Sequence, residues 1–83
     1  MKSETVIDYL NNIKNTATHK QMYELASNIR KIEREIDSQY TFNDEVDVNH
    51  FTILLQSCLV GLPDNQSLLL KPIIRELKLR QIL

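Results

Sequence analysis

Oxygen-bearing side chains alternate along residues 43–49, and this segment offers the first pattern that could bind a metal ion. The alternating residues are Asn43, Glu45, Asp47 and Asn49. A calcium-binding loop begins with this spacing, but it also needs a glycine at its sixth position and a glutamate at its twelfth. Counted from Asn43, those positions hold Val48 and Leu54. The pattern therefore indicates a solvated acidic loop and no calcium site.

The Cys and His residues are too few and too far apart for zinc binding or nucleophilic catalysis. A zinc site needs about four ligands of these types, and the chain has Cys58, His19 and His50, with His19 on a different predicted helix. His50 precedes Cys58 by eight residues, about 12 Å along a helix axis, which prevents the two side chains from sharing a proton. Cys58 lies on an apolar helix face, so we interpret it as a buried structural thiol.

The carboxylates do not indicate acid–base catalysis either. They form two groups, Glu33 with Asp37 and Asp44 with Glu45 and Asp47. General acid–base work needs a carboxylate held in a dry cleft, and so short a chain can hardly fill a core and also enclose such a cleft. The single glycine excludes a glycine-rich phosphate loop. We therefore predict a protein that is not an enzyme, with no catalytic, cofactor-binding or metal-binding residues and no cofactor.

Length and composition predict a single helical domain over residues 1–83. The chain has one glycine and two prolines, far fewer turn residues than an all-β domain uses. Cys58 is the only cysteine, so no disulfide can form within the chain, and a lone thiol suits a reducing compartment. The chain opens with a polar segment that is unlike a signal peptide, and no apolar stretch is long enough to cross a bilayer. We predict a cytoplasmic protein.

The fold predicted from periodicity is an all-α, compact three- or four-helix bundle with one structured acidic loop at residues 39–49. The first helix starts after Ser3, and its apolar face is Val6, Tyr9 or Leu10, Ile13 and Ala17, whereas Asn11, Asn12 and Lys14 point to water. Thr18 with Gln21 matches a capping box, which predicts that the second helix runs from near His19 to about Ser38.

The second half of the chain carries clear start and stop signals. In the loop, Tyr40 and Phe42 are expected to dock on the bundle, and a short hairpin around Asn43-Asp44 is the alternative. The third helix starts near Asp47 or Asn49 and buries a face of five residues: Phe51, Leu54, Leu55, Cys58 and Leu59. Gly61 stands where a C′ residue belongs. Asp64 or Asn65 caps a last helix, which Pro72 kinks or splits, and Ile82-Leu83 is expected to dock.

Residues 22–36 show the strongest helical pattern. Their apolar residues recur at steps of three and four and form a heptad seam: Met22, Leu25, Ile29, Ile32 and Ile36. A lone helix of this length is marginal in water, so the heptad seam must be buried. The sequence leaves open whether it packs against the rest of this chain, a second copy or another protein.

The same segment resembles the UVR-type helical interaction hairpin of repair proteins and Clp-linked adaptors. The aromatic-Glu-x-Ala rhythm of that hairpin corresponds to residues 23–26, Tyr-Glu-Leu-Ala, and its Leu-Arg pair corresponds to Ile29-Arg30. The chain departs from the pattern at Lys31, where an acidic residue is usual, and in the apolar spacing that follows. The resemblance covers under a fifth of the chain, and we assign no family from it.

Charge is distributed unevenly although the net charge is −1. Residues 38–70 carry −4 and residues 71–83 carry +3, so these two segments can attract each other within a chain or between chains. The apolar residues in and before the basic tail, such as Leu69, Ile73 and Leu77, are expected to close the core. Filling a partner's groove is the alternative, and a membrane surface is an unfavoured partner. A pI near 6.1 and the lack of aromatic residues near residues 75–80 make nucleic acid an unfavoured partner.

We predict a small non-catalytic regulator, adaptor or inhibitor that binds another protein, or itself as a homo-oligomer, through apolar helix faces. The residues predicted to contact the partner are Met22, Leu25, Ile29, Ile32, Ile36, Ile73, Leu77, Arg75, Lys78 and Arg80. One alternative is a phage-type small regulatory inhibitor, which has this size. The other is a nucleic-acid-associated helical protein that uses the basic C-terminal helix.

Overall fold

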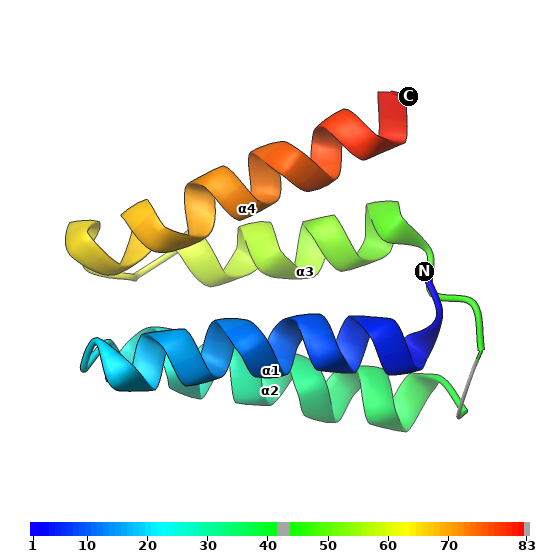
Figure 1. The fold of residues 1–83 in the computed structure, drawn as a ribbon, viewed down its shortest axis with the longest axis horizontal. Coiled ribbons are helices and arrows are strands. Elements are labelled where there is room, and N and C mark those ends of the chain that lie inside the picture. Colours follow the sequence, from blue (N-terminus) through cyan, green and yellow to red (C-terminus); the bar gives the residue numbers. More distant parts are fainter. Residues whose placement is uncertain (42–43, 83) are drawn as a thin grey trace.

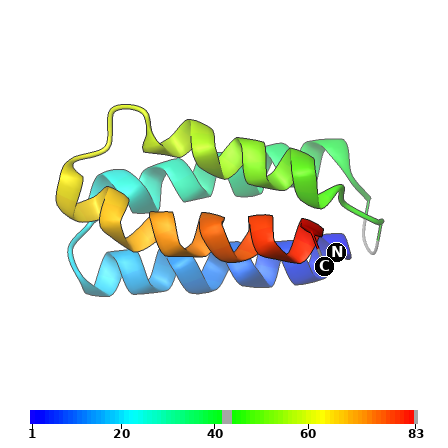
Figure 2. The ribbon, with the colours of Figure 1, turned by 90° about the horizontal axis from the view of Figure 1, so that it is seen from above.

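Four helices pair into two antiparallel hairpins that form two layers. The computed structural model describes residues 1–41 and 44–82, with side chains up to residue 80. Helix α1 (Ser3–His19) packs along α2 (Tyr23–Gln39), and α3 (Val48–Leu59) packs along α4 (Asp64–Ile82), as Figure 1 shows. Seen from above in Figure 2, α1 and α4 lie on one side and α2 and α3 on the other. The predicted all-α bundle is confirmed.

Helix α2 is the central element of the core. It packs against each of the other three helices. Four residues of the heptad seam, Leu25, Ile29, Ile32 and Ile36, are at most 5 % exposed, and Met22 is half-buried. The partner of the heptad seam is therefore the rest of the chain itself. The other fully buried large side chains come from all the remaining elements: Val6, Leu10, Val46, Phe51, Leu55, Leu70 and Leu77.

The predicted capping box at Thr18 and Gln21 is wrong. Helix α1 continues through this segment to His19, and the Thr18 hydroxyl donates to the carbonyl of Lys14 within it. Gln21 then adopts a left-handed backbone (φ 62°) that reverses the chain, and α2 begins at Tyr23, four residues later than predicted. The bond of the Thr18 hydroxyl to the Lys14 carbonyl within α1 competes with its capping of α2.

Helix α2 receives its N-terminal cap from α4 instead of from a neighbouring residue. Met22 at the N-cap position makes no side-chain hydrogen bond. The buried side chain of Gln66 accepts a hydrogen bond from the backbone N–H of Leu25 (2.8 Å) and donates to the carboxylate of Glu24. The bond from Gln66 lowers the pKa of Glu24. One side chain thus joins the two hairpins and satisfies an amide that a helix start leaves unpaired.

The acidic loop is fastened to the N-terminus of the chain. The backbone N–H of Ser3 donates to the Asp44 carbonyl and that of Val46 to the Met1 carbonyl, both at 2.7 Å. The Ser3 hydroxyl donates to the Thr41 carbonyl. Helix α1 begins at Ser3 itself with Lys2 at the N-cap position, so the prediction that it starts after Ser3 is wrong by one residue. Val46 is buried beneath this contact.

The segment that follows α2 contacts the core through Tyr40. Tyr40 is half-buried and packs against the core, as predicted for it. The predictions for Phe42, for a turn at Asn43 and for Leu83 lie outside the described residues, as does the side chain of Ile82.

Helix α3 follows its local signals closely. Asp47 caps α3 by accepting a hydrogen bond from the backbone N–H of Asn49 (2.9 Å), and Gly61 has the left-handed backbone (φ 84°) of a C′ residue.

Helix α4 begins at Asp64, and the backbone N–H groups of Gln66 and Ser67 donate to the Pro63 carbonyl. Pro63 therefore holds the N-cap position, and the prediction that Asp64 or Asn65 caps this helix is wrong. Pro72 neither splits nor ends α4, which is one helix over its full length. Its ring lies on the exposed side of the helix. Proline has no N–H to donate to the Leu68 carbonyl, and on this side water can donate the hydrogen bond instead.

The long-range cap makes a stability prediction. We expect Gln66→Leu to lower the free energy of unfolding by about 1–3 kcal/mol, because it leaves the buried Leu25 N–H unpaired. Urea unfolding followed by circular dichroism measures this loss. The matched control is Asn11→Leu, which removes a side-chain amide at an exposed position of α1 and should change stability by no more than about 0.5 kcal/mol.

The same pair should respond to acid. The depressed pKa of Glu24 means that its bond to Gln66 stabilises the fold above the carboxyl's ordinary pKa and that this contribution disappears as the pH falls. The stability gap between wild type and Gln66→Leu should narrow on acidification. A gap that stays constant across the carboxylate range would contradict the assigned cap.

Candidate functional site

The candidate catalytic residues are kept apart by the fold. Cys58 is buried on the inner face of α3, and burial raises the pKa of its thiol to about 11, an effect that Lys31 slightly offsets. His50 lies at the other end of α3, with its Nε2 atom 3.3 Å from Oε1 of Gln39. In the described part of the chain, no three Cys, His, Asp or Glu side chains come together as a metal site.

The carboxylates of the two predicted groups, except that of Asp37, have structural contacts. Glu33 forms a half-buried ion pair with Lys14 (3.1 Å), which joins α2 to α1, so the prediction that Lys14 points to water is wrong. Glu45 binds the N-terminal amino group (3.0 Å), and that contact lowers the pKa of its carboxyl. Asp44 accepts a bond from the Thr41 N–H, which lowers its pKa as well. The acidic loop therefore pairs with the N-terminus.

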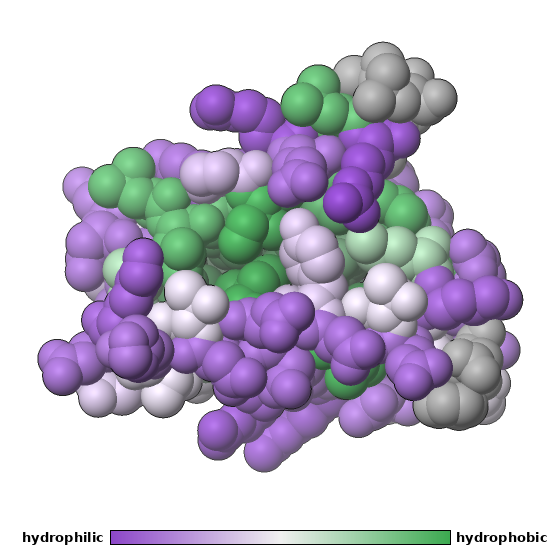
Figure 3. All heavy atoms as spheres, viewed as in Figure 1, coloured by the Kyte–Doolittle hydropathy of each residue, from purple (hydrophilic) through white to green (hydrophobic). Residues whose placement is uncertain are grey.

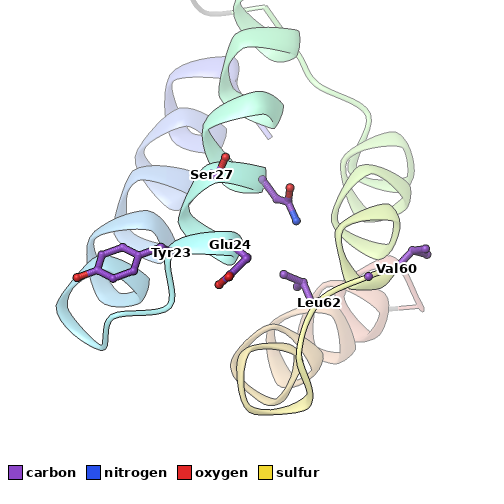
Figure 4. A pocket seen from close by; sticks show the side chains of 7 residues that line it. Tyr23, Glu24, Ser27, Val60 and Leu62 are labelled. Atoms are coloured by element: carbon purple, nitrogen blue, oxygen red, sulfur yellow. The ribbon is translucent and has the colours of Figure 1, made fainter.

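One open pocket lies between the start of α2 and the α3–α4 connection. Its volume is about 450 Å³, and Figure 4 shows Leu62 pointing toward Glu24 across it while Tyr23 and Val60 point away. Glu24 already binds Gln66. The remaining side chains here are small or neutral, so the pocket brings together no acid, base and nucleophile.

An apolar furrow separates α1 from α4. The two helices approach each other at very few points, although each packs along its own hairpin partner. Figure 3 shows an apolar band across this face of the molecule, between α1 below and α4 above. A pocket within the furrow has a volume of about 210 Å³ and an almost wholly apolar lining: Asn12, Ile13, Thr16, Leu69 and Ile73. We call these five residues the apolar furrow.

The core extends to the edge of this furrow through an aromatic contact. The ring of Tyr9 on α1 meets the ring of Phe51 on α3 edge to face, with 6.1 Å between the centroids. Burial raises the pKa of Tyr9, and the nearby carboxylate of Glu76 on α4 raises it further. Glu76 itself pairs with Arg80 at 3.5 Å. The charged side chains of Glu76 and Arg80 on α4 therefore lie near Tyr9 of α1.

A second groove is formed by the N-terminal half of α1 and the C-terminal end of α2. Its volume is about 500 Å³, and its lining contains the apolar side chains of Ile7, Ile36 and Tyr40. Three carboxylates border it: Glu4, Asp8 and Asp37. We call these six residues the acidic groove. Sequence reasoning missed it, although the spacing of Glu4 and Asp8 by four residues on one helix face was a usable signal.

The predicted partner-binding residues fall into two classes. Leu77 is fully buried, as are four of the heptad seam residues, so their side chains are not part of the monomer's surface. Ile73 lines the apolar furrow. Arg75 and Lys78 are exposed and line a shallow pocket against α3, whereas Arg80 lies with Glu76 on another side of α4. The structure thus brings Arg75 and Lys78 together and separates them from Arg80.

No described helix has the length and hydropathy of a membrane-spanning segment. Comparisons with models of known protein families, with curated proteins and with solved structures find no match to this chain. The UVR-like pattern of residues 22–36 therefore stays a likeness in sequence, and any function has to be argued from this molecule's own surfaces.

The buried thiol makes a prediction about reactivity. A pKa raised from 9.0 to about 11 lowers the thiolate fraction near neutral pH roughly a hundredfold, and only the thiolate reacts. We expect Cys58 in the folded protein to react with iodoacetamide far more slowly than in concentrated urea, as measured by mass spectrometry. Equal rates in the folded and unfolded protein would show that the thiol is accessible and activated.

Proposed function

We propose that this protein is a non-catalytic binding module, a regulator, adaptor or inhibitor, which takes an amphipathic helix of another protein into the apolar furrow. The observation that carries the proposal is the open space between α1 and α4. In a closed four-helix bundle these two helices would cover each other's apolar flanks, and here Leu69 and Ile73 remain only half-buried.

The shape and chemistry of the furrow favour a helix as the occupant. Helices α1 and α4 run antiparallel along its two sides, which is the geometry of a groove that accepts a third helix. The lining is almost free of charge, so affinity would come from burial of apolar side chains spaced by three and four residues on the partner. Asn12 and Thr16 are exposed at its α1 edge and could bond polar groups at the rim.

The proposal assigns partner binding to surface residues and leaves the heptad seam in the core. The nucleic-acid alternative has three exposed cations on α4, Lys71, Arg75 and Lys78, but no aromatic residue beside them for stacking. The phage-type inhibitor alternative is a subclass of the same binding function, and it rests on size alone.

Site-specific photo-crosslinking in cells that naturally make the protein tests the furrow. A photoreactive residue at Asn12 should give one discrete protein adduct. We expect Thr16→Glu and Ile73→Glu each to reduce that adduct at least about tenfold, because each places an unpaired charge in the apolar contact. Thr16 is exposed, so its replacement leaves the core intact.

The matched control is Ile53→Glu, an apolar-to-acid change at a half-exposed position on α3. It should leave the adduct at its wild-type level. An adduct that is equally sensitive to Ile53→Glu, or insensitive to both furrow variants, would contradict the proposal. An adduct that nuclease treatment destroys would identify nucleic acid as the occupant and would contradict it too.

A further inference from the structure

The outer face of α4 combines exposed apolar residues with a row of unpaired cations. Leu68 and Leu79 are 65 % and 54 % exposed, and Pro72 is exposed between them. At 100° per residue these three side chains lie on one face, opposite the buried residues of the helix. Lys71, Arg75 and Lys78 form a row immediately beside them. We call these six residues the basic ridge.

The charges of the basic ridge and of the acidic groove are both left without partners inside the molecule. Within the described part of the chain, none of the three ridge cations forms an ion pair, and neither does any of the three groove carboxylates. Surface cations and anions normally occur interspersed on a small domain, and here each sign is gathered around apolar side chains.

The two surfaces match each other in chemistry and in spacing. Glu4 and Asp8 stand four residues apart on α1, about 6 Å along the axis, which is the spacing of Lys71 and Arg75 on α4. Lys78 extends the row of cations by one turn, and Asp37 adds a third carboxylate on the opposite edge of the groove. The exposed leucines of the ridge would cover Ile7 and Tyr40, which are half-buried in the monomer.

The groove and the ridge cannot meet within one molecule. The groove is built from α1 and α2, whereas the ridge faces outward from α4 in the other layer (Figure 1). A contact between them therefore joins two copies. Because it uses a different patch on each copy, it is heterologous and links copies head to tail.

We propose that the acidic groove of one copy binds the basic ridge of a second copy, so that the protein assembles head to tail. This surface is separate from the apolar furrow, and either contact can be present without the other. The contact depends on exposed charges, so it weakens as salt increases. The wild-type protein is expected to show an average mass that rises with concentration in low salt and returns to the monomer in high salt.

Charge reversal on each side tests the pairing by sedimentation velocity of the purified chain. The ridge variant is Arg75→Glu with Lys78→Glu, and the groove variant is Asp8→Lys with Asp37→Lys. Each variant alone should be monomeric. Their mixture should associate with the two variants alternating, since the intact groove of the ridge variant can bind the intact ridge of the groove variant and the two reversed surfaces also attract each other. A chain that carries all four substitutions should associate again.

A control variant with the same change in net charge tests whether the effect depends on the position of the charges. Lys20→Glu with Lys31→Glu changes net charge as the ridge variant does, at exposed sites outside both surfaces, and should associate like the wild type. All these positions are exposed, so circular dichroism should show a folded protein. A wild-type protein that stays monomeric in low salt would overturn the proposal. So would association that survives either reversal, or a mixture that forms no complex.

Discussion

The fold depends on keeping the heptad seam of α2 away from water. Leu25, Ile29, Ile32 and Ile36 are buried on a helix that packs against α1, α3 and α4, and its packing against α1 is the most extensive between any two described helices. A 17-residue helix is marginal without such packing, and α2 has no local N-cap and no basic residue in its last turn. The stability of α2 must therefore come from its packing against the other helices. Those helices in turn bury their apolar faces against the heptad seam.

This dependence explains which structural features could be predicted from the sequence. Periodicity identified the buried faces, and the cap at Asp47 and the stop at Gly61 were predictable because each is completed by residues within a few positions. The cap by Gln66 was not, since its partner amide lies 41 residues away. Thr18 shows the converse error: a local capping pattern was present, but an acceptor in the same helix competed for its hydroxyl.

The candidate surfaces were harder to predict than the core for the same reason. The apolar furrow and the acidic groove are each lined by two helices, and neither helix carries the full pattern. Asp37 joins Glu4 and Asp8 only because α2 runs antiparallel to α1, and Ile73 faces Thr16 only because α4 lies on the same side as α1 (Figure 2). Sequence analysis left open whether the heptad seam packs within the chain and included it among the predicted partner contacts, because it was the strongest pattern. The strongest apolar pattern of a small domain is the one that its own core needs first.

Helix α4 occupies a special position in this arrangement because it has a different role on each side. Leu70, Ile74 and Leu77 face the core, Leu69 and Ile73 border the apolar furrow, and the basic ridge faces outward. A helix with apolar residues on several faces has no single amphipathic stripe, and this is why the tail alone left a partner groove and a membrane surface as alternatives to the favoured role in the core. Once the core face is fixed by packing, the other two faces point in different directions. The partner helix and the second copy that we propose would therefore contact different faces of α4.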